Sequence, residues 1–198
     1  MAAIKRRTQA ERRDQTRAAL LTAALECLVE VGIANFTTTE VCRRAGLSQG
    51  ALFKHFPAKS DLLAATIEHV FDHLRADFEA AFTALPKRNR DARHGLTLLW
   101  DQMFDPRLAA AFDLYTMART DPVLQRALGP VVEQHIEHMH ALAVTLLDGI
   151  DPKRVRDVVD LLTLAIQGLV IDQMALPDAK HRERLRRFLL ELVPLVSS

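Results

Sequence analysis

The chain has 198 residues, 49% of them hydrophobic, and its 26 Lys and Arg nearly balance 25 Asp and Glu to give a formal net charge of +1. This composition excludes a mainly disordered chain and a uniformly basic one, and the length suits one or two compact domains. The charge is uneven, because residues 1–60 hold 10 Lys and Arg against 5 Asp and Glu. A polyanionic partner is therefore expected to meet the N-terminal third.

Two cysteines, Cys27 and Cys42, are too few for a disulfide scaffold and lack the spacing of a metal knuckle. The charged N-terminus is followed by no apolar segment of the kind found in signal peptides. The apolar stretches also look too short for a bilayer span. These features predict a cytoplasmic protein with no membrane partner.

Apolar residues recur at helical spacing along most of the chain, and almost no strand pattern is present. Proline and glycine punctuate the segment boundaries, with Gly32 closing the first helix and Pro130 expected to kink a long one. The sequence therefore predicts an all-α protein. The expected longer helices cover residues 10–31, 60–85, 93–104, 108–118, 122–147, 152–176 and 179–196.

Two further short helices are expected between residues 37 and 55. Thr37 is placed to cap the first of them, and Glu40 follows at the spacing of a capping box. Phe36 and Val41 stand where a hydrophobic staple would pack. These signals predict a two-turn helix that ends at Ala45.

A three-residue turn, Gly46-Leu47-Ser48, separates that helix from a second short one over residues 49–55. Gly46 can take the positive φ that such a turn requires, and Ser48 can cap the second helix. Two short helices joined in this way are typical of a helix-turn-helix, whose second helix enters the major groove of DNA. A generic helical hairpin is the alternative, but the positive charge of this third favours DNA.

The residues around this hairpin resemble the N-terminal signature of the TetR family of transcriptional regulators over about residues 12–65. The positions that carry the resemblance are Gly32, Ile33, Phe36, Thr37, Thr38, Val41, Cys42, Ala45, Gly46, Leu47, Ser48, Gly50, Ala51, Leu52, Phe53, His55, Phe56, Pro57, Ala58, Lys59, Ser60, Asp61, Leu62 and Leu63. The resemblance implies a three-helix DNA-binding domain over residues 1–58 and an effector-binding and dimerisation domain over residues 59–198. It also implies a homodimeric repressor that binds a pseudo-palindromic, inverted-repeat operator and is released by a small effector.

The same resemblance places DNA-contacting residues on matched positions. Gln49 and Lys54 are the candidates for base-edge hydrogen bonds. The whole predicted DNA-binding set is Thr38, Thr39, Arg43, Arg44, Ser48, Gln49, Gly50, Ala51, Lys54, His55 and Lys59. Basic residues of the N-terminal arm add salt-dependent attraction: Lys5, Arg6, Arg7, Arg12 and Arg13. Two departures stand out, since Phe53 replaces a usual tyrosine and Ala58 replaces a usual helix-capping residue.

The last two helices are the expected dimer face, because residues 152–176 are apolar nearly all round and need cover on every side. The predicted dimerisation residues are Val158, Leu162, Ile166, Leu169, Leu185, Phe188, Leu189 and Leu192.

An effector cavity is expected where aromatic residues and methionine concentrate, next to the helix over residues 122–147. The predicted ligand-binding residues are Trp100, Met103, Phe104, Phe112, Tyr115, His135, Met139 and Leu142. His135 could serve as a polar handle or be an ordinary core histidine. Two histidine pairs have helical metal-ligand spacing, His69 with His73 and His135 with His138, but no metal or other cofactor is expected.

No catalytic residues are expected, because the sequence contains no nucleophile elbow, P-loop, dinucleotide fingerprint or zinc-protease motif. Two alternatives remain open at this point. One is an enzyme or helical small-molecule-binding protein, and the other is an adaptor that kept the helix-turn-helix only for its shape.

Overall fold

The computed structural model describes residues 8–147 and 149–196, with side chains as far as residue 193. Within those ranges the chain forms helices and no strand, which confirms the all-α prediction. The elements are α1 (Gln9–Val31), η1 (Ile33–Asn35), α2 (Thr38–Ala45), α3 (Gln49–His55), α4 (Lys59–Ala84), η2 (Lys87–Asn89), α5 (Ala92–Met103), α6 (Pro106–Ala118), α7 (Pro122–Leu146), α8 (Pro152–Ala175) and α9 (Ala179–Val196).

Every predicted helix is present, and its ends lie within two residues of those expected. The largest difference is at α6, which begins at Pro106 because the Asp105 carboxylate caps it by accepting from the Arg107 amide at 2.8 Å. Gly32 closes α1 with φ of 71°, as its sequence position predicts. Helix α7 continues through Pro130 to Leu146.

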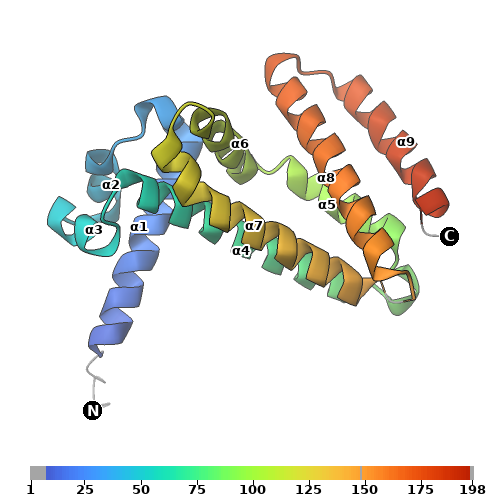
Figure 1. The fold of residues 1–198 in the computed structure, drawn as a ribbon, viewed down its shortest axis with the longest axis horizontal. Coiled ribbons are helices and arrows are strands. Elements are labelled where there is room, and N and C mark those ends of the chain that lie inside the picture. The colour runs from blue at the N-terminus through green and yellow to red at the C-terminus, as the bar shows by residue number, and fades with distance from the viewer. Residues whose placement is uncertain (1–7, 148, 197–198) are drawn as a thin grey trace, which may run out of the picture.

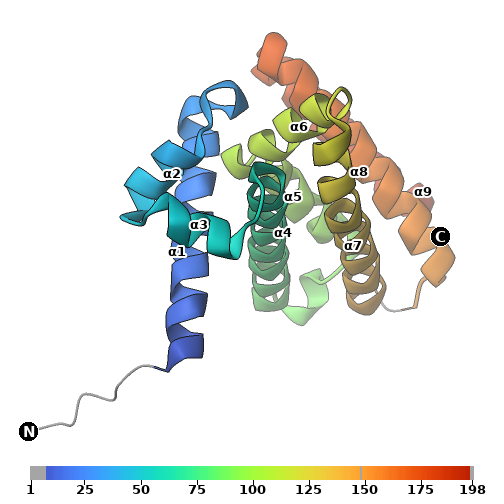
Figure 2. The ribbon, with the colours of Figure 1, turned by 60° about the vertical axis from the view of Figure 1, so that its left-hand side comes forward.

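The helices are arranged around α4, which runs through the middle of the molecule (Figure 1). At one end α4 packs against α1, and along its length it packs against α7. Helices α8 and α9 lie at the opposite end from α2 and α3, where they cover α5 (Figures 1 and 2). Helix α4 is therefore the element that both ends of the molecule share.

Most of the buried apolar residues form one contiguous cluster that extends from α1 to α9. Leu20 of α1, Ile67 of α4 and Ile166 of α8 all belong to it and are fully buried. A displacement at one end of such a close-packed cluster is transmitted to neighbouring helices, because packed side chains leave little room for local accommodation.

Helix α8 departs from one expectation, because it is long and apolar enough to cross a bilayer by length and composition alone. Only Asp160 and Asp172 are charged among residues 158–175. Little of this helix is buried within the chain. It therefore has a broad apolar surface that the other helices of the chain do not cover.

Candidate DNA-binding and effector sites

The short helix α2 begins and ends as its sequence predicts. The Thr37 hydroxyl accepts from the Glu40 amide at 3.1 Å, and the staple residues Phe36 and Val41 are both buried. Gly46 ends the helix in the left-handed region with φ of 65°. Local signals alone therefore fix where this helix starts and stops.

The second short helix, α3, starts at a second cap, where the Ser48 hydroxyl accepts from the Ala51 amide at 3.2 Å. Its buried face is small, with Leu52 fully buried. The predicted base-reading residues Gln49 and Lys54 are exposed on its outer face. The Gln49 amide nitrogen donates to the Thr39 hydroxyl at 2.7 Å, which joins the outer faces of α3 and α2.

The Glu40 carboxylate does not complete the predicted capping box and instead binds two arginines. It accepts from Arg43 Nε at 2.8 Å and Nη2 at 2.6 Å, and from Arg44 Nε at 2.8 Å. Hydrogen bonds from Arg43 and Arg44 lower the pKa of Glu40 to about 2. Helix α2 thus carries an internal ion network where free positive charge is expected.

Arg44 also pairs with Glu30 of α1 at 2.7 Å, and only 15% of its side chain is exposed. Its guanidinium therefore joins α2 to α1, and the carboxylates of Glu30 and Glu40 offset the charge that the sequence predicts to attract DNA. Arg43 is also paired with Glu40, but 69% of its side chain remains exposed.

The start of α4 explains how the chain manages without a capping side chain at Ala58. The backbone amide of Ala58 donates to Asp61 Oδ2 at 2.9 Å, and α4 begins at Lys59. Lys59 Nζ donates to the Phe36 carbonyl at 2.9 Å and lies 5.2 Å from the centre of the Phe36 ring. Lys59 therefore links α4 to the loop before α2. Thr38, Thr39, Ser48, Gly50, Ala51 and His55 are all at least partly exposed.

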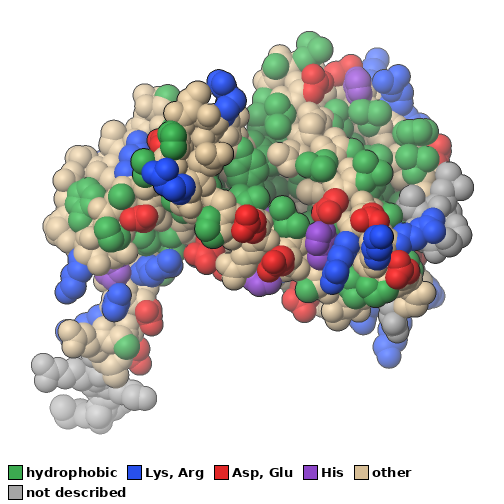
Figure 3. Space-filling model, viewed as in Figure 1, with side chains coloured by type: hydrophobic (Ala, Val, Ile, Leu, Met, Phe, Trp, Pro, Cys, Tyr) green, Lys and Arg blue, Asp and Glu red, His purple; other side chains and the backbone are tan. Residues whose placement is uncertain are grey.

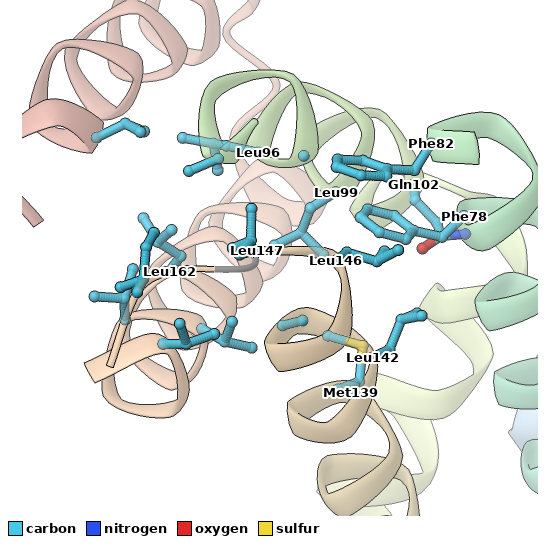
Figure 4. A pocket seen from close by; sticks show the side chains of 18 of the residues that line it. Phe78, Phe82, Leu96, Leu99, Gln102, Met139, Leu142, Leu146, Leu147 and Leu162 are labelled. Atoms are coloured by element: carbon cyan, nitrogen blue, oxygen red, sulfur yellow. The ribbon is translucent and has the colours of Figure 1, made fainter. Parts of the chain in front are cut away.

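An apolar cavity of about 100 Å³ lies at the other end of α4, between α4, α5, α7 and α8 (Figure 4). The rings of Phe78 and Phe82 form its α4 wall, and α7 supplies Met139 and Leu142. The other labelled lining residues are Leu96, Leu99, Gln102, Leu146, Leu147 and Leu162 (Figure 4).

Two polar side chains, Arg75 and Gln102, also line the cavity. Arg75 donates to Asp72 at 2.7 Å and lies 3.0 Å from His138 Nδ1. The Gln102 amide nitrogen donates to the Leu74 carbonyl, so its side-chain oxygen is the group that can accept a hydrogen bond from a guest. Phe78 and Gln102 also border a more open recess of about 250 Å³.

The cavity is not where the aromatic residues concentrate. Of the eight predicted ligand-binding residues, only Met139 and Leu142 line it. Trp100, Met103 and Phe112 are instead buried in the core. The other two aromatic residues of the predicted set, Phe104 and Tyr115, do not line the cavity either. The Arg182 guanidinium lies 4.9 Å from the centre of the Phe104 ring, and burial raises the pKa of Tyr115 to about 12.

His135 is a core histidine that packs α7 onto α4. Its ring stacks on Phe71 with 3.8 Å between ring centres and 12° between planes. Its Nδ1 atom is buried without a hydrogen-bond partner. Burial, together with the nearby charge of Arg75, lowers the pKa of His135 to about 4. The alternative of a plain core histidine therefore fits this residue.

We expect His135 to make the protein sensitive to acid. Because its folded-state pKa of about 4 lies below the ordinary 6.5, the unfolded state binds the proton first and stability falls as pH drops from 6.5 toward 4. The full loss corresponds to roughly 3 kcal/mol. Urea denaturation across this pH range should show a flatter profile for His135→Leu than for wild type. His73→Leu, an exposed position, is the control that should keep the wild-type slope.

The histidine pairs form no metal centre with other ligands. The rings of His69 and His73 are 4.1 Å apart. Over the described ranges, however, no group of three or more His, Cys, Asp or Glu side chains could hold a metal ion.

The exposed apolar face of α8 is rotated from the predicted one. Ile166 is fully buried and Leu169 nearly so, which contradicts their assignment to the dimer face. Val158 and Leu162 line the cavity. The residues that do face solvent recur at helical spacing: Leu161 (65% exposed), Leu164 (66%), Gly168 and Ile171 (48%). On α9, Phe188 is 53% exposed, whereas Leu185, Leu189 and Leu192 are half-buried.

Comparisons with known proteins agree with this architecture. Residues 20–66 match the family described as "Bacterial regulatory proteins, tetR family", and residues 86–195 match "Tetracyclin repressor-like, C-terminal domain". The HTH-type transcriptional regulator CymR of Pseudomonas putida is 31% identical over 191 residues, which cover 95% of this chain and 94% of CymR. An uncharacterised HTH-type transcriptional regulator of Mycobacterium tuberculosis is 31% identical over 180 residues, covering 90% of this chain and 92% of that protein.

Solved structures show the same fold. A TetR-family regulator from a Rhodococcus species superposes with a TM-score of 0.71 at 21% identity, covering 93% of this chain and 100% of that one. RolR in complex with resorcinol has a TM-score of 0.53 at 26% identity, covering 93% and 90%. The multidrug-binding protein EbrR in complex with ethidium has a TM-score of 0.64 at 22% identity, covering 90% and 99%.

Both halves of the chain thus match models of one family, and full-length relatives carry the same description. The family and these relatives are transcriptional regulators, not enzymes. The chain belongs to the TetR family of bacterial transcriptional regulators.

Proposed function

We propose that this protein is a cytoplasmic repressor that binds an inverted-repeat operator as a homodimer and is released by a small, largely apolar effector. The observation that carries the proposal is the course of α4. This helix starts four residues after the end of the recognition helix α3 and continues until Phe78 and Phe82 form a wall of the apolar cavity.

The connection between α3 and α4 is short and stiff. It consists of Phe56, Pro57 and Ala58, and the Phe56 side chain is buried. Proline restricts the backbone, so the connection absorbs little motion. A guest that presses on Phe78 or Phe82 therefore shifts α4, and with it the position of α3 relative to its copy in a dimer.

The cavity favours a small guest with an apolar body and one polar group. Its volume of about 100 Å³ is somewhat smaller than the engineered apolar cavity of about 150 Å³ that binds benzene. A single ring or a branched aliphatic body suits this space, with the Gln102 side-chain oxygen accepting a hydrogen bond. The bound resorcinol of RolR supports a guest of this size in the same fold.

The exposed stripe on α8 supports dimerisation. Leu161, Leu164 and Ile171 form an apolar surface on a helix that also carries Gly168, which allows close approach of a second helix. Together with Phe188 of α9, this stripe suits a symmetric four-helix bundle. The dimer would cover the apolar surface of α8, so no membrane is needed to bury it.

Selection of DNA from a random pool by the purified protein tests the proposal. We expect a pseudo-palindrome whose half-site centres lie about one helical turn, or a multiple of it, apart. Gln49→Ala should cost about 1–3 kcal/mol at particular base pairs and relax the preference there. Gln125→Ala, at an exposed position on α7, is the control that should leave both affinity and preference unchanged.

Failure to select any sequence, together with binding of small apolar molecules, would favour the alternative of a helical small-molecule-binding protein. Selection of a site without any effect of apolar molecules on its affinity would leave a regulator that does not respond through this cavity.

A further inference from the structure

The first turns of α1 project beyond the helices that α1 packs against (Figures 1 and 2). Residues 9–19 are exposed except for the half-buried Thr16, and burial begins at Leu20. A helical end without tertiary packing is marginal in water. Its start is nevertheless well defined, because Thr8 and Glu11 form a complete capping box. This exposed end is therefore available to a partner.

The inward stripe of α1 changes character where the helix leaves the core. Within the core this stripe consists of Leu28, Ala24 and Leu21, all buried. Continued toward the N-terminus at the same spacing of three and four residues, it meets Arg17 and then Arg13. An apolar face thus becomes a basic face at the edge of the domain.

These two arginines lie beside the C-terminal end of the recognition helix. The Arg17 guanidinium carbon is 5.3 Å from the centre of the Phe56 ring, and Phe56 is the residue that ends α3. Burial lowers the pKa of His55, the last residue of α3, and three nearby positive charges lower it further, those of Arg13, Lys54 and Arg17. Helix α1 and the end of α3 therefore share one positive surface, and Figure 3 shows Lys, Arg and His side chains gathered there.

The charges of this surface are free where those of α2 are not. Arg43 and Arg44 pair with carboxylates. Arg13, Arg17 and Lys54 have no ion pair within 4 Å among the residues that the structure describes, and all three are exposed. Of the carboxylates on the same part of α1, Glu11 is bonded to the Thr8 amide and Asp14 is exposed.

We propose that Arg13 and Arg17 form a phosphodiester-binding ridge that holds the DNA backbone beside Lys54 of the recognition helix. This inference rests on the proposed operator binding and names the residues that anchor it. Guanidinium groups suit the role because their planar donors match phosphate oxygens in pairs. The sequence already predicts salt-dependent attraction from Arg13, and the ridge adds Arg17 to it.

The salt dependence of operator binding tests the ridge. Each phosphate contact contributes about 0.9 to the slope of log affinity against log salt, so two arginines in each of two subunits contribute about 3.6. Operator affinity can be measured by fluorescence anisotropy between 50 and 300 mM salt. In the double variant Arg13→Gln/Arg17→Gln the magnitude of the slope should be smaller than in the wild type by about 3.6. The variant should keep its base preference, because phosphate contacts carry no sequence information.

The matched control is Arg88→Gln/Arg184→Gln, which removes the same charge from exposed positions in η2 and α9. A second variant, Arg17→Lys, keeps the charge and should keep most of the slope. Far-UV circular dichroism establishes that each variant is folded.

Equal slopes for the ridge variant and the wild type would overturn the proposal while operator binding stands. An equal drop in the control variant would also overturn it, because the effect would then come from net charge alone. Absence of any operator binding by the wild type would overturn the ridge and the proposed function together.

Discussion

Leu164→Glu is expected to convert the proposed dimer into a monomer and to weaken operator binding by more than about 100-fold. Leu164 is 66% exposed and lies in the centre of the apolar stripe on α8. In the proposed bundle its carboxylate would be buried against a symmetry-related apolar surface without a partner, at a cost of several kcal/mol. The folded monomer should tolerate the change, because the same position faces water.

Light scattering at micromolar concentration measures this outcome directly. Val123→Glu is a matched control, since Val123 is 54% exposed at the start of α7, outside the stripe, and should leave the dimer intact. Phe188→Glu tests the contribution of α9 in the same way. A folded Leu164→Glu protein that remains dimeric would place the interface on another surface.

Ala143→Trp is expected to mimic the effector. Ala143 lines the cavity from α7, and an indole there fills most of the space and presses on the opposite α4 wall formed by Phe78 and Phe82. Operator affinity should fall by about 1–3 kcal/mol, or roughly 5- to 150-fold, which is the usual range of allosteric coupling. The variant should also lose its response to small apolar molecules.

Ala76→Trp is the matched control, because Ala76 lies on α4 but faces solvent. It should keep wild-type affinity and response. Titration of both variants with the operator by fluorescence anisotropy, at one salt concentration, gives the comparison. Unchanged operator affinity in a folded Ala143→Trp protein would separate the cavity from DNA binding.

Features set by neighbouring residues were predictable from the sequence. The caps at Thr37 and Ser48 and the glycine turn at Gly46 act over three or four residues, and each is found where it was expected. The longer helices follow from periodicity and from proline and glycine at their ends. Family membership could be recognised for the same reason, because its signature lies in this local pattern.

Features that depend on distant residues were not predictable. Arg44 pairs with Glu30, fourteen residues away on another helix, so its charge could not be known to be neutralised. Aromatic residues such as Trp100 predicted a cavity, but their large side chains pack in the core instead. The cavity instead lies between α4, α5, α7 and α8, where the side chains of these helices leave space.

The rotation of α8 shows the limit most clearly. Its sequence is apolar on nearly every side, so periodicity alone does not say which side faces the core. Packing against α5 and α7 decides that Ile166 is buried and that Leu164 is exposed. The sequence thus determined that this helix needs a partner, whereas only the tertiary structure decided which of its residues remain for that partner, because contacts between distant helices fix the rotation.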